Sequence, residues 1–446
     1  MSRYQVYGEY KESGVEWLGS LPSHWDVKRL GHFFEERREK VSDKDYAALS
    51  VTMKGIVPQL ETAAKTDAGD SRKLVLKDDF VINSRSDRKG ASGISPYDGS
   101  VSLISIVMAP RNIYPEFAHH LLRSYPFQEE FYRYGKGIVA DLWSTNSSEL
   151  KNILLPEIPI VEQQAIANFL EHETAKIDTL IAKQQQLIKL LKEKRQAVIS
   201  HAVTKGLNPN APMRDSGVEW LGEVPEHWRI GKCGFYLSIL SGFAFPSAGF
   251  SDDEVGTKLL RGINVGVSRL KWNETVYWKR KTGDALDIYE MKAGDLVIGM
   301  DRPLISEGIR VAKVKEGDLP CLLLQRVASL KTGNELNSDY LLAFLSSEMF
   351  SAYFSPDTTG VSVPHISPEQ INNFEIAIPT IEEQEAIAVF LSSEISKFDR
   401  LIEEAEFAND LLQERRTALI SAAVTGKIDV RDWQPASTSP PLEAAA

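Results

Sequence analysis

Two segments of this chain occur twice. Residues Glu12–Trp25 (ESGVEWLGSLPSHW) and Asp215–Trp228 (DSGVEWLGEVPEHW), the two openers, align without gaps and are identical at 10 of 14 positions. Residues Ala165–Thr204 and Ala386–Thr425, the cores of two arms, also align without gaps and are identical at 20 of 40 positions. The sequences between the repeats do not match by eye. A duplicated frame around two dissimilar inserts favours a protein with two readers over an enzyme with one active site.

Each arm is predicted to be a long helix. Alternating steps of four and three residues from Ile166 trace a stripe in which seven of eleven residues are large and apolar, and the second arm keeps the same phase from Ile387. Forty helical residues span roughly 60 Å, and a lone surface helix of that length is marginal. A two-fold relation between the halves would pair the arms antiparallel, with the inserts at opposite ends. The alternative is that each arm packs on its own globular domain.

The ends of the arms carry recognisable signals. Thr380 followed by Glu383 has the spacing of a capping box, whereas Ile160 is a poorer cap for the first arm. Gly206 and Gly426 are expected to end the two helices.

The two inserts, residues 26–157 and 229–377, are predicted to be mixed α/β. Their β-rich runs are Lys73–Leu76, Phe80–Asn83, Ser102–Met108, Asp295–Gly299, Arg310–Val314 and Leu322–Leu330, and a helix is expected at Tyr340–Phe350. The expected division is two variable domains (1–157 and 215–377), two arms (158–206 and 378–428), a linker (207–214) and a disordered tail (429–446). The fold class is therefore α+β, with two mixed α/β domains separated by two long helices that form an antiparallel coiled coil, related by a pseudo-two-fold internal repeat.

Charge and composition limit the classes of protein. The net charge of −11 argues against a nucleic-acid partner, so DNA binding would need local basic loops or a basic partner. The uncharged run Val101–Pro110 is about half of what a bilayer span needs. The first residues lack the apolar core of a secretory signal, so a cytoplasmic location is expected. Cys233 and Cys321 have no metal-ligand spacing, which fits a reducing compartment.

The sequence carries no recognisable catalytic motif. It has neither a phosphate-binding Gly-x-x-x-x-Gly-Lys-Ser/Thr loop nor a Gly-x-Ser-x-Gly elbow. Pro440–Pro441 is followed by leucine, which has no ring to stack on a flipped base. Asp287, Glu290 and Lys292 have nuclease-like spacing but precede a predicted turn, and His119–His120 has no third metal ligand nearby. We expect a chain that catalyses nothing and holds no metal.

Several segments together resemble the specificity subunits of type I restriction–modification systems, over nearly the whole chain. The opener "SGVEWLG…P.HW" occurs twice. The runs "LKNILLPEIPIVEQQAIANFL" (150–170) and "INNFEIAIPTIEEQEAIAVFL" (371–391) resemble the start of the family's conserved helices, and "SHAVTKGL" and "SAAVTGKI" resemble their ends. "FVINSRSDRKGASGISPYDGSVS" (80–102) and "SGFAF" (241–245) resemble family target-recognition domains.

The resemblance implies a non-catalytic protein that reads an asymmetric, two-part site on double-stranded DNA. Each variable domain would read one half-site, and the arms would act as a ruler for the gap and dock two modification (methyltransferase) subunits. Those subunits would carry S-adenosylmethionine and methylate adenine, and restriction (translocase/nuclease) subunits would use ATP and Mg; this chain would hold no cofactor. The rivals are a self-contained nuclease or methyltransferase, and a coiled-coil scaffold that joins two protein-binding domains.

Base edges are read mainly by Arg or Lys on guanine and by Asn or Gln on adenine. The first domain has a dense cluster of such residues in a loop after a predicted strand, for which a solvated turn is the alternative: Asn83, Ser84, Arg85, Arg88 and Lys89. The second domain has scattered candidates: Arg261, Asn264, Arg302, Gln325 and Arg326. The repeated tryptophans cannot distinguish two half-sites, so we interpret them as packing anchors: Trp17, Trp25, Trp220 and Trp228.

Overall fold

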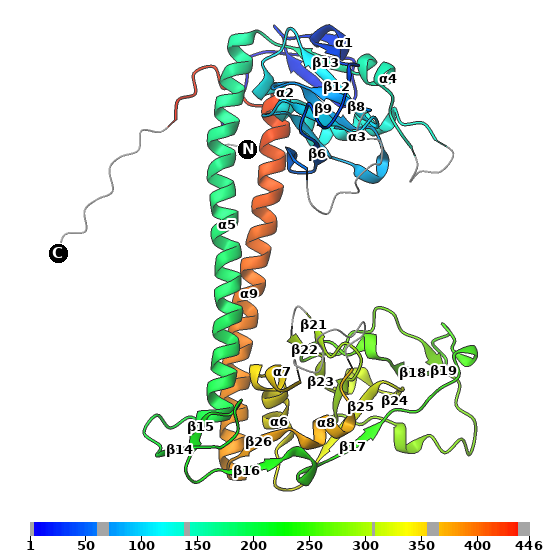
Figure 1. The fold of residues 1–446 in the computed structure, drawn as a ribbon, viewed down its shortest axis with the longest axis vertical. Coiled ribbons are helices and arrows are strands. Elements are labelled where there is room, and N and C mark those ends of the chain that lie inside the picture. The colour runs from blue at the N-terminus through cyan, green and yellow to red at the C-terminus, as the bar shows by residue number, and fades with distance from the viewer. Residues whose placement is uncertain (1–3, 60–70, 138–142, 306–307, 355–364, 436–446) are drawn as a thin grey trace, which may run out of the picture. The chain divides into compact units, whose positions relative to one another are not determined.

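The structure, a computed structural model, describes residues 4–59, 71–137, 143–305, 308–354 and 365–435. The chain divides into two compact units, which we describe separately. Unit 1 comprises Met1–Gln185 and Phe407–Ala446, and unit 2 comprises Gln186–Glu406. Both units contain part of each of two long helices, α5 (Ile160–Lys205) and α9 (Ile381–Val424) (Figure 1). Among the described residues, no helix combines the length and the apolar character that a membrane span requires.

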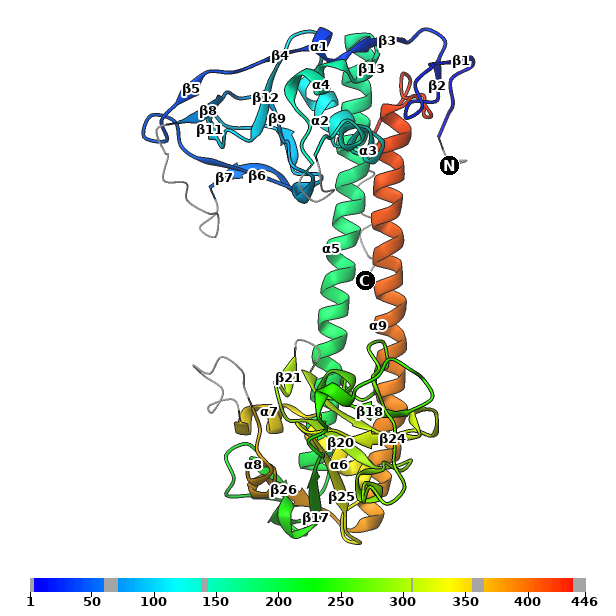
Figure 2. The same ribbon diagram turned by 90° about the vertical axis from the view of Figure 1, so that its right-hand side faces the viewer.

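The two long helices run antiparallel within each unit (Figures 1 and 2). In unit 1, the Arg416 guanidinium donates to the Asp178 carboxylate at 2.7 and 3.2 Å. In unit 2, Arg195 donates to Asp399 at 2.9 Å. In the ungapped alignment of the arms, Arg195 matches Arg416, and Asp178 matches Asp399. The same ion pair therefore forms once in each unit, with the two helices exchanging roles.

The helix ends follow the sequence signals in part. Gly206 and Gly426 have φ values of +73° and +71°, as expected for residues that end helices. The Thr380 hydroxyl accepts from the Glu383 amide at 3.3 Å, which confirms it as a cap. The predicted capping box is otherwise wrong, because the Glu383 carboxylate binds His227 instead of returning to Thr380.

Short paired strands attach each opener to its unit. These strands are β1 (Tyr10–Glu12) with β2 (Ser20–Pro22), β3 (Asp26–Arg29) with β13 (Leu154–Glu157), β14 (Met213–Asp215) with β15 (Glu223–Pro225), and β16 (Arg229–Lys232) with β26 (Glu375–Ile378). All four pairs are antiparallel, and the register repeats: Tyr10 faces Pro22 as Met213 faces Pro225. The repeated sequence thus folds twice into the same local structure.

The first variable domain contains a four-stranded antiparallel sheet in the order β10-β9-β12-β4. These strands are β4 (Phe34–Glu36), β9 (Phe80–Asn83), β10 (Ser92–Ile94) and β12 (Ser105–Pro110). Beside it lie a three-stranded sheet of β5 (Lys40–Val41), β8 (Arg72–Val75) and β11 (Gly99–Val101), and a hairpin of β6 (Leu49–Thr52) and β7 (Gly55–Pro58). The helices are α1 (Leu30–Phe33), α2 (Pro115–Arg123), α3 (Tyr125–Arg133), α4 (Ser147–Asn152) and the 3-10 turn η1 (Ser86–Arg88).

The second variable domain contains a four-stranded antiparallel sheet in the order β17-β25-β20-β23. These strands are β17 (Leu237–Ser241), β20 (Leu296–Gly299), β23 (Val311–Lys313) and β25 (Val327–Thr332). The other strands are β18 (Thr257–Leu260), β19 (Tyr277–Trp278), β21 (Leu304–Ile305), β22 (Gly308–Ile309) and β24 (Cys321–Leu323). The helices are α6 (Ser338–Leu345), α7 (Glu348–Phe354) and α8 (Pro368–Asn373), with 3-10 turns η3 (Cys233–Phe235), η4 (Ser247–Gly249), η5 (Gly262–Asn264), η6 (Asp287–Tyr289) and η7 (Glu316–Asp318).

The two four-stranded sheets have the same topology. We number the strands of each sheet along the chain. The first sheet, read from β10, has the spatial order 3-2-4-1, and the second sheet, read from β23, has the same order. The three-stranded sheets differ, because β18 pairs with β24 in parallel while β8 pairs with β11 antiparallel. The two inserts therefore share an architecture that their sequences do not reveal.

Several predicted elements need correction. The run Leu322–Leu330 is two strands in different sheets, β24 and β25, joined by a tight turn at Leu324–Arg326. The predicted helix Tyr340–Phe350 is two helices, α6 and α7. Val430 is 1% exposed and the Trp433 ring packs edge-on against Phe169, so the start of the predicted tail is part of unit 1. Residues 436–446 lie outside the described residues.

Candidate nucleic-acid interface

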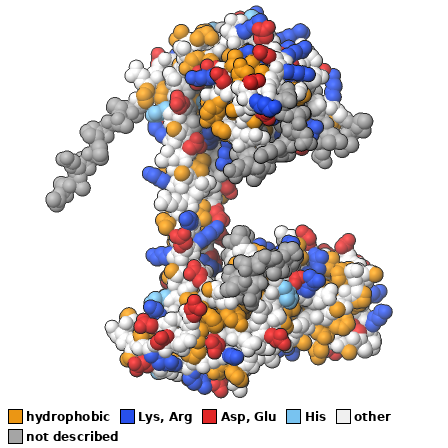
Figure 3. Space-filling model, viewed as in Figure 1, with side chains coloured by type: hydrophobic (Ala, Val, Ile, Leu, Met, Phe, Trp, Pro, Cys, Tyr) orange, Lys and Arg blue, Asp and Glu red, His pale blue; other side chains and the backbone are white. Residues whose placement is uncertain are grey.

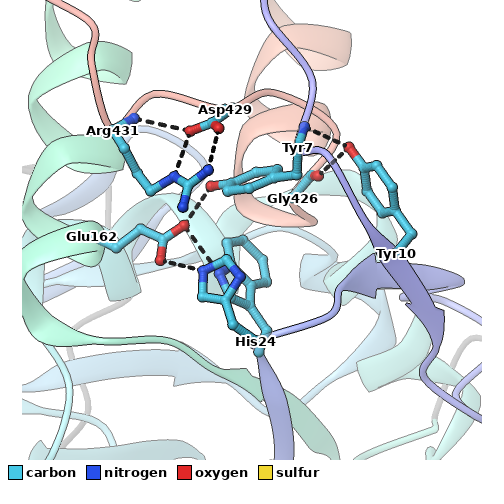
Figure 4. A network of polar contacts seen from close by, with 8 residues as sticks. Tyr7, Tyr10, His24, Glu162, Gly426, Asp429 and Arg431 are labelled. Atoms are coloured by element: carbon cyan, nitrogen blue, oxygen red, sulfur yellow. Dashed lines mark hydrogen bonds and ion pairs between the residues drawn. The ribbon is translucent and has the colours of Figure 1, made fainter.

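The side chains of each opener join its variable domain to the first turn of a long helix, and Figure 4 shows this network in unit 1. In unit 1, the buried carboxylate of Glu162 accepts from the Tyr7 hydroxyl at 2.5 Å and from the Trp25 indole at 3.1 Å, and lies 2.9 Å from His24 Nε2. In unit 2, Glu383 takes the place of Glu162, because the alignment of the arms, continued back to their first turns, matches these two residues. It lies 3.0 Å from His227 and accepts from the Trp228 indole at 3.4 Å.

The tryptophans of the openers are packing anchors. Trp25 and Trp228 are 0% and 1% exposed, and the Trp220 indole donates to the Glu375 carbonyl at 3.1 Å. Trp17 packs edge-on against Phe127. This confirms the prediction that they hold the frame together.

A glutamine next to each of these glutamates fixes the variable domain to its helix. Gln163 accepts from the Tyr114 amide at 2.8 Å, and Gln384 accepts from the Asn337 amide at 2.8 Å. Tyr114 and Asn337 immediately precede α2 and α6, the first helices after the two four-stranded sheets. Both glutamines are buried, and their repetition in the sequence was a signal that we did not use. Each variable domain is thus held rigidly against the start of a long helix.

Neither unit presents a broadly basic face in the view of Figure 3, where Lys and Arg are interspersed with Asp and Glu. A local basic site does occur in unit 2, around an open pocket of about 690 Å³. Its lining includes four cationic side chains and one carboxylate: Lys271, Arg302, Arg310, Arg326 and Asp301. The sequence candidates Arg302, Gln325 and Arg326 are therefore brought together, although they are scattered along the chain. A concentration of positive charge in an acidic protein is what binding a nucleic acid requires.

Ion pairs and burial shift the pKa values of two side chains that line this pocket, Asp301 and Arg310. The Asp301 carboxylate pairs with the Arg326 guanidinium and lies 2.8 Å from His365 Nδ1. Burial works to raise the pKa of Asp301, but the hydrogen bonds with Arg326 and His365 outweigh it and keep that pKa below its usual value. Burial lowers the pKa of Arg310, whose Nε donates to the Val265 carbonyl at 2.9 Å. Arg310 thus supports the pocket wall, whereas Arg302 and Arg326 are exposed.

Arg261 and Asn264 lie on the loop that forms another side of the pocket, at Gly262–Gly266. Asn264 is 1% exposed, and its side-chain amide accepts from the Arg261 backbone amide at 3.0 Å and donates to the Lys271 carbonyl at 2.9 Å. Arg261 donates to the Glu274 carbonyl at 2.5 Å. Asn264 therefore shapes the loop, and in this structure its amide does not reach the surface. Lys271 and Arg310 were not predicted as site residues; Arg310 was identified only as the start of the β-rich run Arg310–Val314.

In unit 1, the candidate loop follows β9 and is tied to neighbouring segments. Asn83 is buried and its side chain accepts from the Arg85 amide at 3.0 Å, while the Ser84 carbonyl accepts from the Thr145 amide at 3.0 Å. Arg85 is exposed, and so is Arg88, whose side chain is 69% exposed. These bonds define the loop backbone and leave the arginines facing solvent.

The Lys89 side chain contacts side chains of α3. Its Nζ pairs with Glu129 at 2.5 Å and lies 5.6 Å from the centre of the Tyr132 ring. Burial raises the pKa of Tyr132 to about 12, and its hydroxyl accepts from the Gly90 amide at 3.2 Å. Lys89 therefore packs on α3 in this structure, and Arg85 and Arg88 are the freer cations.

The two candidate loops occupy matching places. The loop Asn83–Lys89 follows β9, and Asp301–Arg302 follows β20. Both strands are second along the chain in sheets of identical order. Sequence reasoning did not connect them, because the inserts do not align.

The described residues hold no group of three or more side chains suited to a metal ion. His119 and His120 lie on α2, where burial and the charges of Arg123 and Arg416 lower the pKa of His119 to about 3 and that of His120 to about 4. Burial raises the pKa of the Cys233 thiol to about 12, so this thiol is not a nucleophile at neutral pH.

Comparisons with known proteins agree with this picture. A family model described as the type I restriction modification DNA specificity domain matches residues 272–406. The MjaVIII type I restriction enzyme specificity subunit of Methanocaldococcus jannaschii is 27% identical over 438 residues, covering 95% of this chain and 98% of that protein. The EcoAI specificity subunit of Escherichia coli is 31% identical over 219 residues, covering 49% of this chain and 35% of that protein.

A solved chain from work on complex assembly and conformational transition of the type I restriction–modification system has the same fold. It superposes with a TM-score of 0.69 and 17% identity, covering 92% of this chain and 99% of that one. Residues 272–406 thus match a DNA specificity domain of type I restriction modification systems, and Arg302 and Arg326 of the basic pocket lie within this matched segment. Over nearly its whole length, the chain is similar to type I restriction enzyme specificity subunits.

Proposed function

We propose that this chain recognises an asymmetric, two-part site on double-stranded DNA for a type I restriction–modification complex, each variable domain reading one half-site. The observation that carries this proposal is the pair of sheets with one topology and different loops. Two four-stranded sheets of the same order that present unlike side chains at the same place can read two unlike sequences. A scaffold for protein partners, the alternative, does not account for the basic pocket around Arg302 and Arg326.

The proposed division assigns residues 1–157 and 215–377 to two target-recognition domains, 158–206 and 378–428 to the helical arms, and 207–214 to the linker. The remainder, 429–446, includes the packed residues Val430 and Trp433 before any free tail. The proposed DNA contacts are the exposed candidates Arg85, Arg88, Arg302, Gln325 and Arg326. Asn83, Ser84, Lys89, Arg261 and Asn264 act in this proposal mainly by shaping the loops.

The arms form an antiparallel coiled coil in this proposal, fixing the gap between the half-sites and docking two modification subunits. Docking is supported by large apolar side chains that the arms leave exposed: Leu180, Leu187, Leu190, Val389 and Phe407. The modification subunits supply S-adenosylmethionine, and restriction subunits supply ATP and Mg chemistry. This chain is non-catalytic and holds no cofactor itself. The complex works in the cytoplasm, on the DNA of the cell.

Exchange of one insert tests the function. Residues 26–157 are replaced by the corresponding insert of another specificity subunit, and the complex with modification subunits is used to select duplexes from a randomised library. We expect one half of the selected motif to change while the other half and the gap persist. A change in both halves, or in neither, would contradict the assignment.

Insertion of one heptad into both arms is the matched experiment on the ruler. We expect a longer gap between two unaltered half-sites, because the arms alone change length. An unchanged gap with altered half-sites would reject the ruler.

A further inference from the structure

A tight turn precedes the last strand of each four-stranded sheet. Leu103–Ile104 form this turn before β12, and Gln325–Arg326 form it before β25. Ser105, just after the first turn, pairs with Asn83, and Val327, just after the second, pairs with Gly299. Each turn therefore lies beside the candidate loop that follows the second strand of its own sheet. Turn and loop form one continuous edge in each domain.

The two turns carry opposite chemistry at this matched place. Leu103 and Ile104 are large aliphatic side chains, and they are 43% and 39% exposed. Gln325 and Arg326 are also exposed but are polar and cationic. A shared edge with different side chains is the property that two half-sites of different sequence require.

The backbone of the second turn is held from behind. The Gln325 amide donates to the Phe243 carbonyl at 2.9 Å, and the Gly242 amide donates to the Val327 carbonyl at 3.0 Å. A Cβ on Gly242 would lie 2.2 Å from the Leu324 carbonyl oxygen, so only glycine permits this approach. Arg326 has a φ of +69°, a left-handed conformation that an L side chain rarely adopts. Such strain is typical of functional sites that the surrounding structure enforces.

Asp301 fixes the direction of the Arg326 side chain. Its carboxylate, 23% exposed, pairs with one guanidinium nitrogen, and its second oxygen lies 2.8 Å from His365. The Arg326 side chain itself is 67% exposed. A planar guanidinium held on one edge can offer its remaining N–H groups in a fixed orientation. Asp301 is thus a positioning residue, and Arg326 is the group that it aims.

We propose that these two turns are the base-contacting elements of the two domains. Arg326, aimed by Asp301, reads guanine and Gln325 reads adenine in one half-site, whereas Leu103 and Ile104 contact thymine methyl groups in the other. This inference rests on the proposed function and names the side chains that make the two domains unlike.

The test compares Arg326→Gly and Asp301→Asn with the unaltered chain, each in complex with modification subunits and challenged with randomised duplexes. Glycine removes the reading side chain and relieves the strained φ, so Arg326→Gly should fold as well as the original. We expect preference for one guanine in one half-site to fall about 10-fold or more in Arg326→Gly and at least several-fold in Asp301→Asn, with the other half-site unchanged. Asp287→Asn removes the same charge from an exposed ion pair with Arg280 and serves as the control.

The reciprocal variant replaces Leu103 and Ile104 with serine. It should weaken thymine preference in the opposite half-site only. Full base preference in Arg326→Gly, or equal loss in both half-sites, would overturn the assignment of the turns. An original complex that selects no two-part motif would instead refute the proposed function, so the two failures are distinguishable.

Discussion

The hydrogen bonds between each opener and the first turn of its long helix give a quantitative prediction, because the chain contains two versions of them, at Glu162 and at Glu383. Glu162 accepts from two donors, Tyr7 and Trp25, contacts His24, and has a side chain only 6% exposed. Glu383 has an equivalent place in unit 2, but its side chain is 40% exposed and its bond to the Trp228 indole is 3.4 Å.

The perturbation is glutamine in place of each glutamate. Gln preserves shape, and its Oε1 can still accept from Tyr7 and Trp25, but it removes the charge that strengthens both bonds and turns an NH₂ group toward His24 Nε2. Weakening two buried bonds to a charged acceptor and replacing the carboxylate contact with His24 costs about 2–4 kcal/mol in Glu162→Gln. In Glu383→Gln, water can replace the lost acceptor, so the cost is about 1 kcal/mol or less.

Native-state hydrogen exchange measures each set of bonds separately, which matters because two units need not unfold together. Exchange of the amides around β1–β3 should accelerate by about 30- to 900-fold in Glu162→Gln, the factor that corresponds to about 2–4 kcal/mol. The corresponding amides around β14–β16 should accelerate several-fold at most in Glu383→Gln. Equal acceleration in the two variants, or a larger effect in unit 2, would refute the reasoning from burial and donor number.

Three further predictions concern the packing of Trp228, the turn Gln325–Arg326 and the dependence of stability on pH. Trp228→Ala removes a ring that is 1% exposed and should lower the stability of unit 2 by about 3–5 kcal/mol in thermal denaturation. Gly242→Ala places a Cβ against the Leu324 carbonyl and should weaken selection of one half-site while sparing the other. Burial, with Arg123, lowers the pKa of His119 to about 3. Protonation of His119 therefore favours the unfolded chain, and this residue alone should cost unit 1 about 2 kcal/mol between pH 7 and pH 5.

Each of these predictions has a matched control. Trp143→Ala removes a ring that is 39% exposed, and a loss equal to that of Trp228→Ala would contradict the packing argument. Gly317→Ala adds a Cβ with nothing within 4 Å and should leave selection intact. His119→Gln should remove about half of the acid-induced loss of stability, because burial also lowers the pKa of His120 to about 4. An undiminished loss would exclude His119 as a cause.

The repeat made the frame predictable from sequence. Residues that recur unchanged, such as Trp25 and Trp228, serve the same packing role in both units. The arms were predictable because an apolar stripe with helical spacing persists over many turns. Even the ion pairs were encoded, since the Asp and the Arg that form them occupy the same aligned positions in both arms.

The shared topology of the inserts was not predictable, because strand order is set by long-range backbone pairing, which leaves no common residue pattern. The reading turns were hidden for a related reason. Leu324–Arg326 and Ser102–Ile104 contain no Gly, Pro, Asn or Asp, the residues that mark turns in a sequence. Both turns were therefore interpreted as parts of continuous strands. Arg302 and Arg326 were identified as residues, but only the fold brings them to one pocket.

Under the proposed function, one chain reads two different half-sites across a fixed gap. Methylation-sensitive sequencing of genomic DNA from cells with and without this chain, in the presence of its modification subunits, measures this directly. The account predicts methylated adenines in an asymmetric two-part motif with a gap of constant length, all lost when the chain is deleted. A continuous motif, a gap of variable length, or methylation that persists without the chain would contradict it.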